Sequence, residues 1–518
     1  MKIVFQKAAG ALDFSPLKEV IMMHRDFVFF YLNGKAVTVR AEKTRMMLAD
    51  FLRYERRLTG TKIVCAEGDC GACTVLKCSV HGGDQDFISI NSCIATVAQM
   101  DGCSLVTVEG LAQPGASSQE TELHPIQQAM IQCHGSQCGF CTPGFVVATA
   151  GLVEKKLKDP ASTNLTEKDA KNYLTGNLCR CTGYQAIVDA VVSVDLQQCS
   201  SVKDRYWTSA IQNHLQQQTD KSILIQSLET SPGWIYFAPR TLTEAKNYLH
   251  QYPDAKIVAA GTDFGVLVNK EKMEPTHWLS LHLVSDLYQV RTINSHLGSR
   301  MYVGARVTLS ELRRCTEKSV PEFSRFLDIF ASPQIKNAAT LVGNIANASP
   351  IADTPAFMMI ANAVLHVVGH HADRDIPLEN FYQSYRQTAL RPGEMITGIS
   401  FDLPASTDWL RLRKSSQRKD LDIACVNLGI RLRRQGQNIQ DLKISMGGVA
   451  ATPVRLNKTE KSLQGRAWDE HLLPELVNLV QAEIQPISDL RGSAEFRRLL
   501  VKNLLTQMHH EILQGDSI

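Results

Sequence analysis

The sequence predicts a multidomain α+β protein, and three observations support this prediction. The chain has 518 residues, more than a single hydrophobic core normally organises. Eight of its 14 cysteines lie in four short clusters between Cys65 and Cys181. From Trp234 onward, strands and helices alternate with Gly-rich turns. We therefore expect cysteine-rich N-terminal domains followed by α+β domains without cysteine clusters.

Composition and charge exclude several classes of function. The chain is 44% apolar and 21% charged, with a net charge of +3, which is ordinary for a globular protein. This nearly balanced charge does not indicate electrostatic binding to nucleic acid or to a membrane surface. No run of about 18 apolar residues predicts a transmembrane helix. Residues 1–25 lack the continuous apolar stretch of a secretory signal, so we expect a loose leader and a cytoplasmic protein.

The first domain is expected over residues 26–110 and resembles a β-grasp fold. Residues 27–39 predict a hairpin that turns at Asn33-Gly34. Apolar residues at helical spacing follow between Thr44 and Tyr54. A loop rich in Gly and Cys comes next, and strand character resumes at 74–76 and 87–90.

Three further segments follow. Helical patterns at 125–132, 143–156 and 167–174 predict a small helical domain over 111–192. The polar stretch that follows has little periodicity and predicts a linker over 193–230. Strand patterns at 423–432 and 443–449, then helices from His471 and Ser493, predict a C-terminal α+β domain over 408–515. Residues 231–407 are expected to form a further domain between the linker and the C-terminal domain.

The first cysteine motif points to an iron–sulfur cluster. Cys65, Cys70 and Cys73 follow the order C-x4-C-x2-C, with nineteen residues between Cys73 and Cys93, the spacing of plant-type [2Fe–2S] ligands. Gly68 and Gly71 permit the backbone angles of a loop wrapped around a cluster. They also let backbone N–H groups approach the sulfur atoms. Structural zinc usually uses two C-x2-C pairs, whereas only one is present here.

A second set of four cysteines could bind either of two kinds of metal centre. Cys138 and Cys141 form a C-x2-C pair, and Cys179 and Cys181 form a C-x-C pair beyond helical sequence. Four thiolates could bind one tetrahedral zinc ion or another [2Fe–2S] cluster.

The two sets together carry a resemblance to a known family. Gln-Cys-Gly-Phe-Cys-Thr-Pro-Gly at 137–144 and Cys-Arg-Cys-Thr-Gly-Tyr at 179–184 resemble the iron–sulfur domains of the xanthine dehydrogenase family of molybdenum hydroxylases. The resemblance implies two [2Fe–2S] clusters, one in a ferredoxin-like domain and one in a four-helix domain. It also implies that Gln137 lies near a molybdopterin cofactor. The remaining cysteines, expected to be plain thiols, are Cys78, Cys103, Cys133, Cys199, Cys315 and Cys425.

The second half of the chain lacks the Rossmann G-x-G-x-x-G motif. The loop at 260–265, after a predicted strand, could offer successive N–H groups to a pyrophosphate, although a plain turn has the same pattern. Residues 343–353 could likewise be an ordinary loop with an Asp-capped turn. Both loops resemble the family's FAD domain, which has the vanillyl-alcohol-oxidase-type α+β fold. The positions that match its flavin contacts are Lys256, Ile257, Val258, Ala259, Ala260, Gly261, Thr262, Asp263, Phe330, Ala339, Thr340, Gly343, Asn344, Asn347, Asp353, Ile396 and Lys414.

The function that this resemblance implies is electron transfer. Electrons from the oxidation of hypoxanthine or xanthine to urate would reach the Cys138 cluster, then the Cys65 cluster, then FAD and finally NAD. The family's molybdenum-binding part has no counterpart here, so we expect it on a large partner subunit, in a heterotetramer of two small and two large subunits. In this respect the chain resembles the small subunits of bacterial xanthine dehydrogenases.

Two other functions remain open at this stage. The chain could serve a molybdenum hydroxylase that oxidises aldehydes or aromatic heterocycles. A zinc-stabilised binding protein without catalytic activity is the alternative outside the enzymes.

Overall fold

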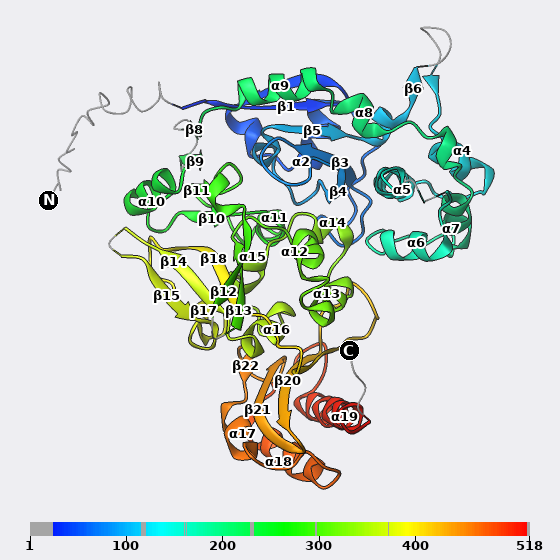
Figure 1. Cartoon of the computed structure of the whole chain (residues 1–518). Coiled ribbons are helices and arrows are strands. Elements are labelled where there is room, and N and C mark those ends of the chain that lie inside the picture. Colours follow the sequence, from blue (N-terminus) through cyan, green and yellow to red (C-terminus); the bar gives the residue numbers. More distant parts are fainter. Residues whose placement is uncertain are drawn as a thin grey trace, which may run out of the picture.

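The computed structural model describes residues 24–114, 121–159, 161, 163–227, 233–295, 298–370 and 372–514. The leader predicted over 1–25 therefore lies outside the described residues, except for His24 and Arg25. Within the described part, four groups of elements follow one another along the chain (Figure 1). The predicted multidomain α+β fold class is confirmed. No helix in the described ranges is both long and apolar enough to cross a bilayer.

The first domain is built on a five-stranded sheet in the order β2-β1-β5-β3-β4. The predicted hairpin turns at Asn33 (φ 49°) and Gly34 (φ 79°), a two-residue turn whose left-handed angles suit Asn-Gly. The helix expected from Thr44 begins only at Leu48 and continues as a π-helix over Phe51–Glu55. The elements are β1 (Phe27–Leu32), β2 (Lys35–Arg40), α2 (Leu48–Asp50), β3 (Thr74–Ser79), β4 (Ile88–Asn91) and β5 (Cys103–Val106).

The helical domain contains the three helices predicted from periodicity and further short elements. Apolar side chains of α5 are almost all buried, and this helix packs on β3 of the first domain. The elements are α3 (Val108–Leu111), β6 (Gln113–Pro114), β7 (Thr121–Glu122), α4 (Pro125–Gln132), α5 (Thr142–Leu157), α6 (Glu167–Tyr173) and α7 (Gln185–Val192).

The described part of the segment 193–230, expected to be a linker, contains a 3-10 helix at Leu196–Gln198, two α-helices and a strand. The α-helices and the strand are α8 (Val202–Tyr206), α9 (Ser209–Gln218) and β8 (Ile223–Ser227). Helix α9 lies along β1 and buries only Leu215 fully, so its sequence shows little apolar periodicity. Strand β8 pairs antiparallel with β9 of the next domain. Tertiary packing thus orders a segment whose polar composition predicted a linker.

The third domain has two larger sheets with helices between them, and the two-stranded sheet β16-β17. The first sheet has the order β10-β11-β9-β8, and the second β12-β13-β18-β14-β15. The elements of the first part are β9 (Trp234–Ala238), α10 (Leu242–Gln251), β10 (Lys256–Val258), α11 (Phe264–Asn269) and β11 (His277–Ser280). Those that follow are β12 (Val290–Ser295), β13 (Gly298–Gly304), α12 (Leu309–Thr316), α13 (Pro321–Asp328), α14 (Pro333–Lys336), α15 (Leu341–Ala346), α16 (Thr354–Ile360), β14 (Val364–Val368), β15 (Arg374–Pro377), β16 (Tyr382–Ser384), β17 (Gln387–Thr388) and β18 (Met395–Asp402).

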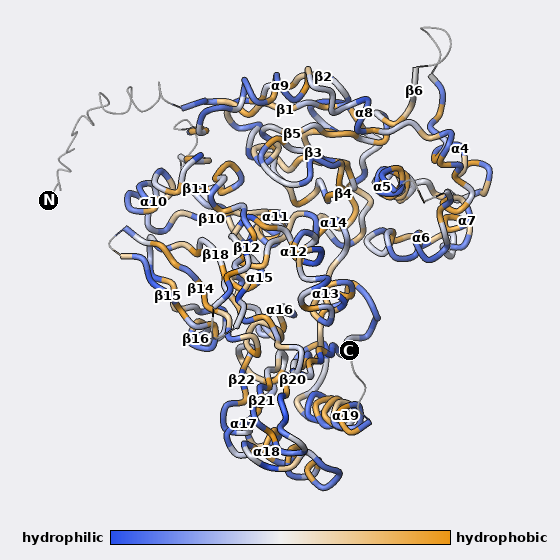
Figure 2. The backbone as a smooth tube through the Cα atoms, viewed as in Figure 1, coloured by the Kyte–Doolittle hydropathy of each residue, from blue (hydrophilic) through white to orange (hydrophobic). Residues whose placement is uncertain are grey.

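The C-terminal domain is a four-stranded sheet in the order β19-β20-β21-β22 with helices packed on it. Its last two helices begin directly after His471 and Ser493, as predicted. Figure 2 shows hydrophobic residues along α19, which packs on β19 and β20. The elements are β19 (Trp409–Ser415), β20 (Val426–Gln435), β21 (Asn438–Gly447), β22 (Val454–Arg455), α17 (Asn457–Leu463), α18 (Leu472–Glu483) and α19 (Ala494–Leu513).

Hydrophobic cores extend across the predicted domain boundaries. One face of the first sheet shares a core with the helical domain, where Phe29 and Leu76 pack with Phe145. The other face shares a core with the third domain, where Phe30 and Trp278 are both fully buried. The first sheet is therefore held between its two neighbours, which fixes the cysteine loops relative to both.

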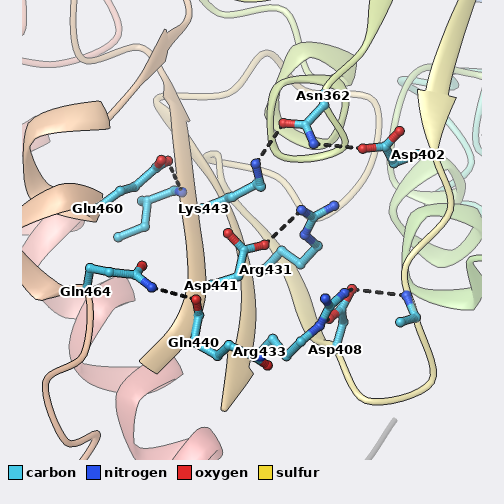
Figure 3. Close-up of polar contacts among 12 residues, drawn as sticks. Asn362, Asp402, Asp408, Arg431, Arg433, Gln440, Asp441, Lys443, Glu460 and Gln464 are labelled. Carbon is cyan, nitrogen blue, oxygen red and sulfur yellow. Dashed lines mark hydrogen bonds and ion pairs between the residues drawn. The ribbon is translucent and has the colours of Figure 1, made fainter. Parts of the chain in front are cut away.

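A polar cluster joins the C-terminal domain to the third domain (Figure 3). The Nζ of Lys443 donates to Oδ1 of Asn362 at 2.8 Å, and Nδ2 of Asn362 donates to Asp402 at 2.7 Å. Arg455 donates to the same Oδ1 at 3.3 Å. Asn362 adopts a left-handed φ of 47°, which Asn tolerates better than most residues.

Replacing Asn362 with alanine should loosen this junction. The change removes the acceptor of Lys443 and the donor to Asp402, and such losses in partly buried sites cost about 1–3 kcal/mol. We expect the calorimetric transition of the C-terminal domain to move to lower temperature. Asn362→Gly is the control for backbone angle, because glycine accepts positive φ. If both variants unfold like the wild type, the amide does not stabilise the junction.

Candidate functional site

Four cysteines of the first domain converge at one place, called site 1 (Cys65, Cys70, Cys73 and Cys93). The first three lie on the loop that leads into β3, and Cys93 follows β4. Side-chain contacts join Cys65 to Cys70, Cys65 to Cys93, and Cys73 to Cys93. Hydrogen bonds with Cys70 and Cys93 hold the pKa of Cys65 far below its usual range, while the contact with Cys65 raises the pKa of Cys93. The sequence prediction that these four thiols share a site agrees with this geometry.

The loop of site 1 is shaped by glycine and by backbone donors. Gly68 (φ 76°) and Gly71 (φ 67°) both have left-handed angles. A Cβ at Gly71 would lie 2.2 Å from the carbonyl oxygen of Gly176, so no larger residue fits there. The N–H of Glu67 donates to the Cys65 sulfur at 3.4 Å. Donors of this kind stabilise thiolates and cluster sulfurs.

Site 1 is covered by the third domain. Cys73 and Cys93 are 2% and 3% exposed, and the side chains of Val266 and Ile335 pack against them. Cys65 and Cys70 are only partly buried. One side of the site thus faces α11 and α14, where water is excluded.

The second set of cysteines also converges, in two pairs, and is called site 2 (Cys138, Cys141, Cys179 and Cys181). The sulfur atoms of Cys181 and Cys138 lie 3.4 Å apart, and Cys141 contacts Cys179 through its side chain. A backbone hydrogen bond from Phe140 lowers the pKa of Cys138. Cys138 and Cys181 are exposed at the surface, in contrast to site 1.

The pairwise contacts fit a two-iron centre, in which two protein ligands serve each iron. In the part of the chain that the structure describes, no group of three or more His, Cys, Asp or Glu residues surrounds a single metal-ion position. At site 1 the thiol contacts run in a chain from Cys70 through Cys65 and Cys93 to Cys73, and at site 2 they form two pairs. Backbone N–H groups point at the sulfurs of Cys65 and Cys138. The donor chemistry at both sites therefore fits [2Fe–2S] clusters.

A backbone hydrogen bond connects the segment before Cys179 to the site 1 loop. The N–H of Leu178, the residue before Cys179, donates to the carbonyl oxygen of Cys70 at 3.0 Å. Close approach of the two domains makes this possible, since a Cβ at Gly144 would lie 2.3 Å from the Gly71 carbonyl oxygen. Cys70 and Leu178 are 108 residues apart in the sequence, and only the tertiary structure brings their backbones into contact.

The first predicted flavin loop follows β10 and leads into α11. It lies against the first domain, because a Cβ at Gly265 would meet the carbonyl oxygen of Ile94 at 2.2 Å. Gly261 has a left-handed φ of 80°. A cavity of about 190 Å³ is lined by Thr262 of this loop and Thr340 of the second. Ligand sites usually measure roughly 300–1,000 Å³, so this cavity could take only part of a dinucleotide.

The second predicted loop converges on the first and on a buried ion pair. Nδ2 of Asn347 donates to Oδ1 of Asp263 at 3.3 Å, which joins the two loops. Nζ of Lys414 lies 2.7 Å from Oδ2 of Asp353, and their side chains are 2% and 6% exposed. The same ammonium group is 6.0 Å from the centre of the Phe330 ring. Asp353 of the second loop, Lys414 of β19 and the Phe330 ring thus place a buried ion pair next to an aromatic ring.

The other predicted contacts lie around this centre at different depths. The hydroxyl of Thr340 caps α15 by accepting from the N–H of Gly343 at 3.0 Å, and Thr354 donates to Asn344 at 2.6 Å. Ile396 is buried in β18, whereas Lys256 is exposed at the start of β10. Gln137 is exposed beside Cys138.

Replacing Lys414 with methionine should reduce flavin binding. Asp353 would remain buried without its cation, and breaking a buried pair costs about 3–5 kcal/mol. We expect less bound flavin per chain by absorbance, together with a lower unfolding temperature. Arg433→Met is the matched control, because it removes the partner of buried Asp408 in the same sheet. That variant should unfold earlier but keep its flavin, and equal flavin loss in both would contradict a local role for Lys414.

Four family models match successive parts of the chain. Residues 30–98 match the 2Fe-2S iron-sulfur cluster binding domain, and 107–192 match the [2Fe-2S] binding domain. Residues 227–405 match the FAD binding domain in molybdopterin dehydrogenase, and 411–512 match the CO dehydrogenase flavoprotein C-terminal domain. The four domains fit the molybdenum hydroxylase family. Two [2Fe–2S]-binding domains and one FAD-binding domain are therefore supported.

Curated relatives include enzymes of more than one substrate class. The chain is 29% identical to xanthine dehydrogenase 1 of Arabidopsis thaliana over 537 residues, covering 91% of the chain and 38% of that protein. It is 28% identical to aldehyde oxidase 4 of Cavia porcellus over 549 residues, covering 95% and 40%. The chain spans about two fifths of the length of these relatives.

A solved structure gives a likeness in fold. A chain of carbon monoxide dehydrogenase from Hydrogenophaga pseudoflava superposes with a TM-score of 0.50 and 24% identity, over 52% of this chain and 94% of that one.

Sequence reasoning missed three polar residues that hold site 1 in place. Nδ2 of Asn269 donates to the carbonyl oxygens of Ala66 and Cys93, both at 2.8 Å. Nε2 of Gln334 donates to Oδ1 of Asn177 at 2.8 Å. Asn177 stands two residues before Cys179 and could have been found from that position. Asn269 and Gln334 carry no local signal, because their partners lie in other domains.

Proposed function

We propose that this chain is the electron-transfer subunit of a xanthine dehydrogenase. Electrons would enter from a molybdopterin centre that oxidises hypoxanthine or xanthine, pass site 2 and then site 1, and leave through FAD to NAD. The observation that carries this proposal is the backbone hydrogen bond between the site 2 segment and Cys70, with site 1 seated against the FAD-binding domain. When bound, two [2Fe–2S] clusters and FAD would supply one-electron and two-electron redox chemistry.

The residues of this chain would hold and insulate the cofactors. The eight thiolates would ligate the clusters, while Val266 and Ile335 exclude water from the inner side of site 1. The backbone donors around Cys65 and Cys138 would stabilise negative charge on the sulfurs. Lys414 and Asp353 would line the flavin site, as the resemblance implies.

A molybdopterin-binding large subunit is proposed as the electron donor, in a heterotetramer of two small and two large subunits. The exposure of Cys138, Cys181 and Gln137 supports this, because it leaves site 2 accessible to another redox centre. Placement in the cytoplasm is supported by the 14 cysteines, all of which are free thiols in the structure.

Cofactor content and reduction by two donors test the proposal. The purified chain should contain iron and flavin and show visible absorbance. Anaerobic NADH should bleach the flavin of the chain alone, since hydride transfer is reversible, whereas xanthine should bleach it only when the molybdenum partner is added. Failure of NADH to reduce the flavin would remove NAD as the acceptor. Xanthine turnover by the chain alone would refute the division of labour between subunits.

A second candidate differs only in substrate. The aldehyde oxidase relative of Cavia porcellus is 28% identical, close to the 29% of the Arabidopsis xanthine dehydrogenase. The reconstituted pair would be assayed on xanthine, hypoxanthine and aldehydes. Turnover of aldehydes alone would favour an aldehyde-oxidising system.

A further inference from the structure

A buried amide pair lies where three domains meet, and it is called the junction node (Thr74, Asn177 and Gln334). Nε2 of Gln334 donates to Oδ1 of Asn177 at 2.8 Å and reaches Oγ1 of Thr74 at 3.3 Å. The exposed fractions of the three residues are 2%, 3% and 1%. Thr74 belongs to the first domain, Asn177 to the helical domain and Gln334 to α14 of the FAD-binding domain.

The junction node acts on one peptide carbonyl of the site 1 loop. The oxygen of Gly71 accepts from Nδ2 of Asn177 at 3.0 Å and from the hydroxyl of Thr74 at 2.6 Å. It also accepts from the N–H of Thr74 at 3.1 Å. Three donors on one buried carbonyl strongly polarise the peptide unit to which it belongs.

That peptide unit leads directly to a sulfur atom. The Gly71 carbonyl and the Ala72 N–H belong to the same peptide, and the Ala72 N–H faces the Cys70 sulfur as a backbone donor that favours the thiolate form. Polarisation of the carbonyl makes this N–H a better donor, because chains of hydrogen bonds strengthen one another. A continuous series of hydrogen bonds therefore runs from Gln334 through Asn177 to the Gly71–Ala72 peptide, whose N–H faces the Cys70 sulfur.

The fit around the node leaves little freedom. A Cβ at Gly176 would lie 2.0 Å from Oε1 of Gln334, and this oxygen is buried without a hydrogen-bond partner among the described residues. The amide orientation of Gln334 is set by its contacts, since Oδ1 of Asn177 can only accept. Retaining an unsatisfied buried oxygen is costly, and that cost points to a role beyond packing.

We infer that Gln334 is a positioning residue that raises the reduction potential of the cluster at site 1. By orienting Asn177 it strengthens the backbone donor that faces the Cys70 sulfur, and donors to ligand sulfurs favour the reduced, more negative cluster. The inference rests on the proposed function, because it requires a cluster at site 1. It assigns to the FAD-binding domain a direct effect on the redox centre next to it.

The test is a redox titration of the complete, cofactor-loaded chain, followed by electron paramagnetic resonance. Gln334→Met removes the donor, and Gln334→Glu keeps the shape while replacing the donor with an acceptor. Both should lower the midpoint potential of the site 1 cluster, by about tenfold in the reduction equilibrium or about 59 mV for one electron. The site 2 potential and the iron content should stay unchanged.

A control on the same helix end separates tuning from simple cohesion of the domains. Asn337 also crosses from the FAD-binding domain to the first domain, where Nδ2 donates to the Ser89 carbonyl oxygen at 2.9 Å, but it does not touch the cysteine loop. Asn337→Ala should leave the site 1 potential unchanged. An equal shift in Asn337→Ala, or wild-type potentials in both Gln334 variants, overturns the inference. A wild-type chain without iron would overturn the proposed function and this inference together.

Discussion

Replacing Cys73 with alanine should remove one iron–sulfur cluster and leave the other. Cys73 is almost fully buried between Cys93 and Ile335, so no water or neighbouring side chain can take over its ligand position. Since a [2Fe–2S] cluster needs all four thiolates, the variant should retain about half of the iron. Iron analysis and the visible spectrum measure this directly.

A cysteine outside both sites provides the control. Cys78 lies on β3, the strand that begins next to Cys73, and is 1% exposed. Cys78→Ala creates a small cavity but removes no predicted ligand, so its iron content should equal that of the wild type. Cys138→Ala should also lose half of the iron. It should lose the signals of the site 2 cluster and keep those of site 1, the reverse of Cys73→Ala. Full iron in Cys73→Ala would contradict the assignment of site 1.

Replacing Arg25 with methionine should destabilise the contact between the first domain and the FAD-binding domain. The guanidinium group makes two hydrogen bonds to Asp101, of 2.9 and 2.8 Å, and two to the carbonyl oxygen of Lys221. The side chains of Arg25 and Asp101 are 5% and 0% exposed. Loss of one partner leaves a buried charge, which costs about 3–5 kcal/mol. Urea unfolding should show this difference.

The exposed pair of Arg40 and Asp26 supplies the matched control. Their side chains are 54% and 69% exposed, and such pairs contribute about 0–1 kcal/mol. Arg40→Met should therefore unfold almost like the wild type. Equal effects of the two substitutions would show that burial of Asp101 is not what makes Arg25 important.

The effect of Arg25 should depend on pH. Burial opposes ionisation of Asp101, but the hydrogen bonds from Arg25, together with the His81 ring whose Nε2 lies 3.6 Å from Oδ2, outweigh it and lower the pKa of Asp101 from 3.8 to about 2. A depressed carboxyl pKa contributes stability above the unfolded value, and this stability is lost as pH falls through the folded value. The advantage of the wild type over Arg25→Met should be largest well above pH 3.8 and should narrow as the pH falls toward 2. Burial lowers the pKa of neighbouring His81, so both proteins should also lose stability below the usual histidine pKa.

Local sequence patterns determined most of the elements and both sets of thiols. Asn33-Gly34 predicted a hairpin because both residues accept left-handed angles, and α4, α5 and α6 followed from apolar spacing at 3.6 residues per turn. The spacing of Cys65, Cys70 and Cys73 fixed their common loop. These features depend on residues close together in the chain, which is why the sequence alone could predict them.

Only the tertiary structure decided how the sites are connected. Gln334 reaches Asn177 and Thr74 across 157 and 260 residues of sequence, and nothing near Gln334 indicates either partner. Residues 193–227 are ordered because α9 covers β1 and β8 joins another sheet, although their composition is polar. Hydrogen bonds and burial between domains depend on where distant surfaces meet, and local propensity carries no information about that meeting.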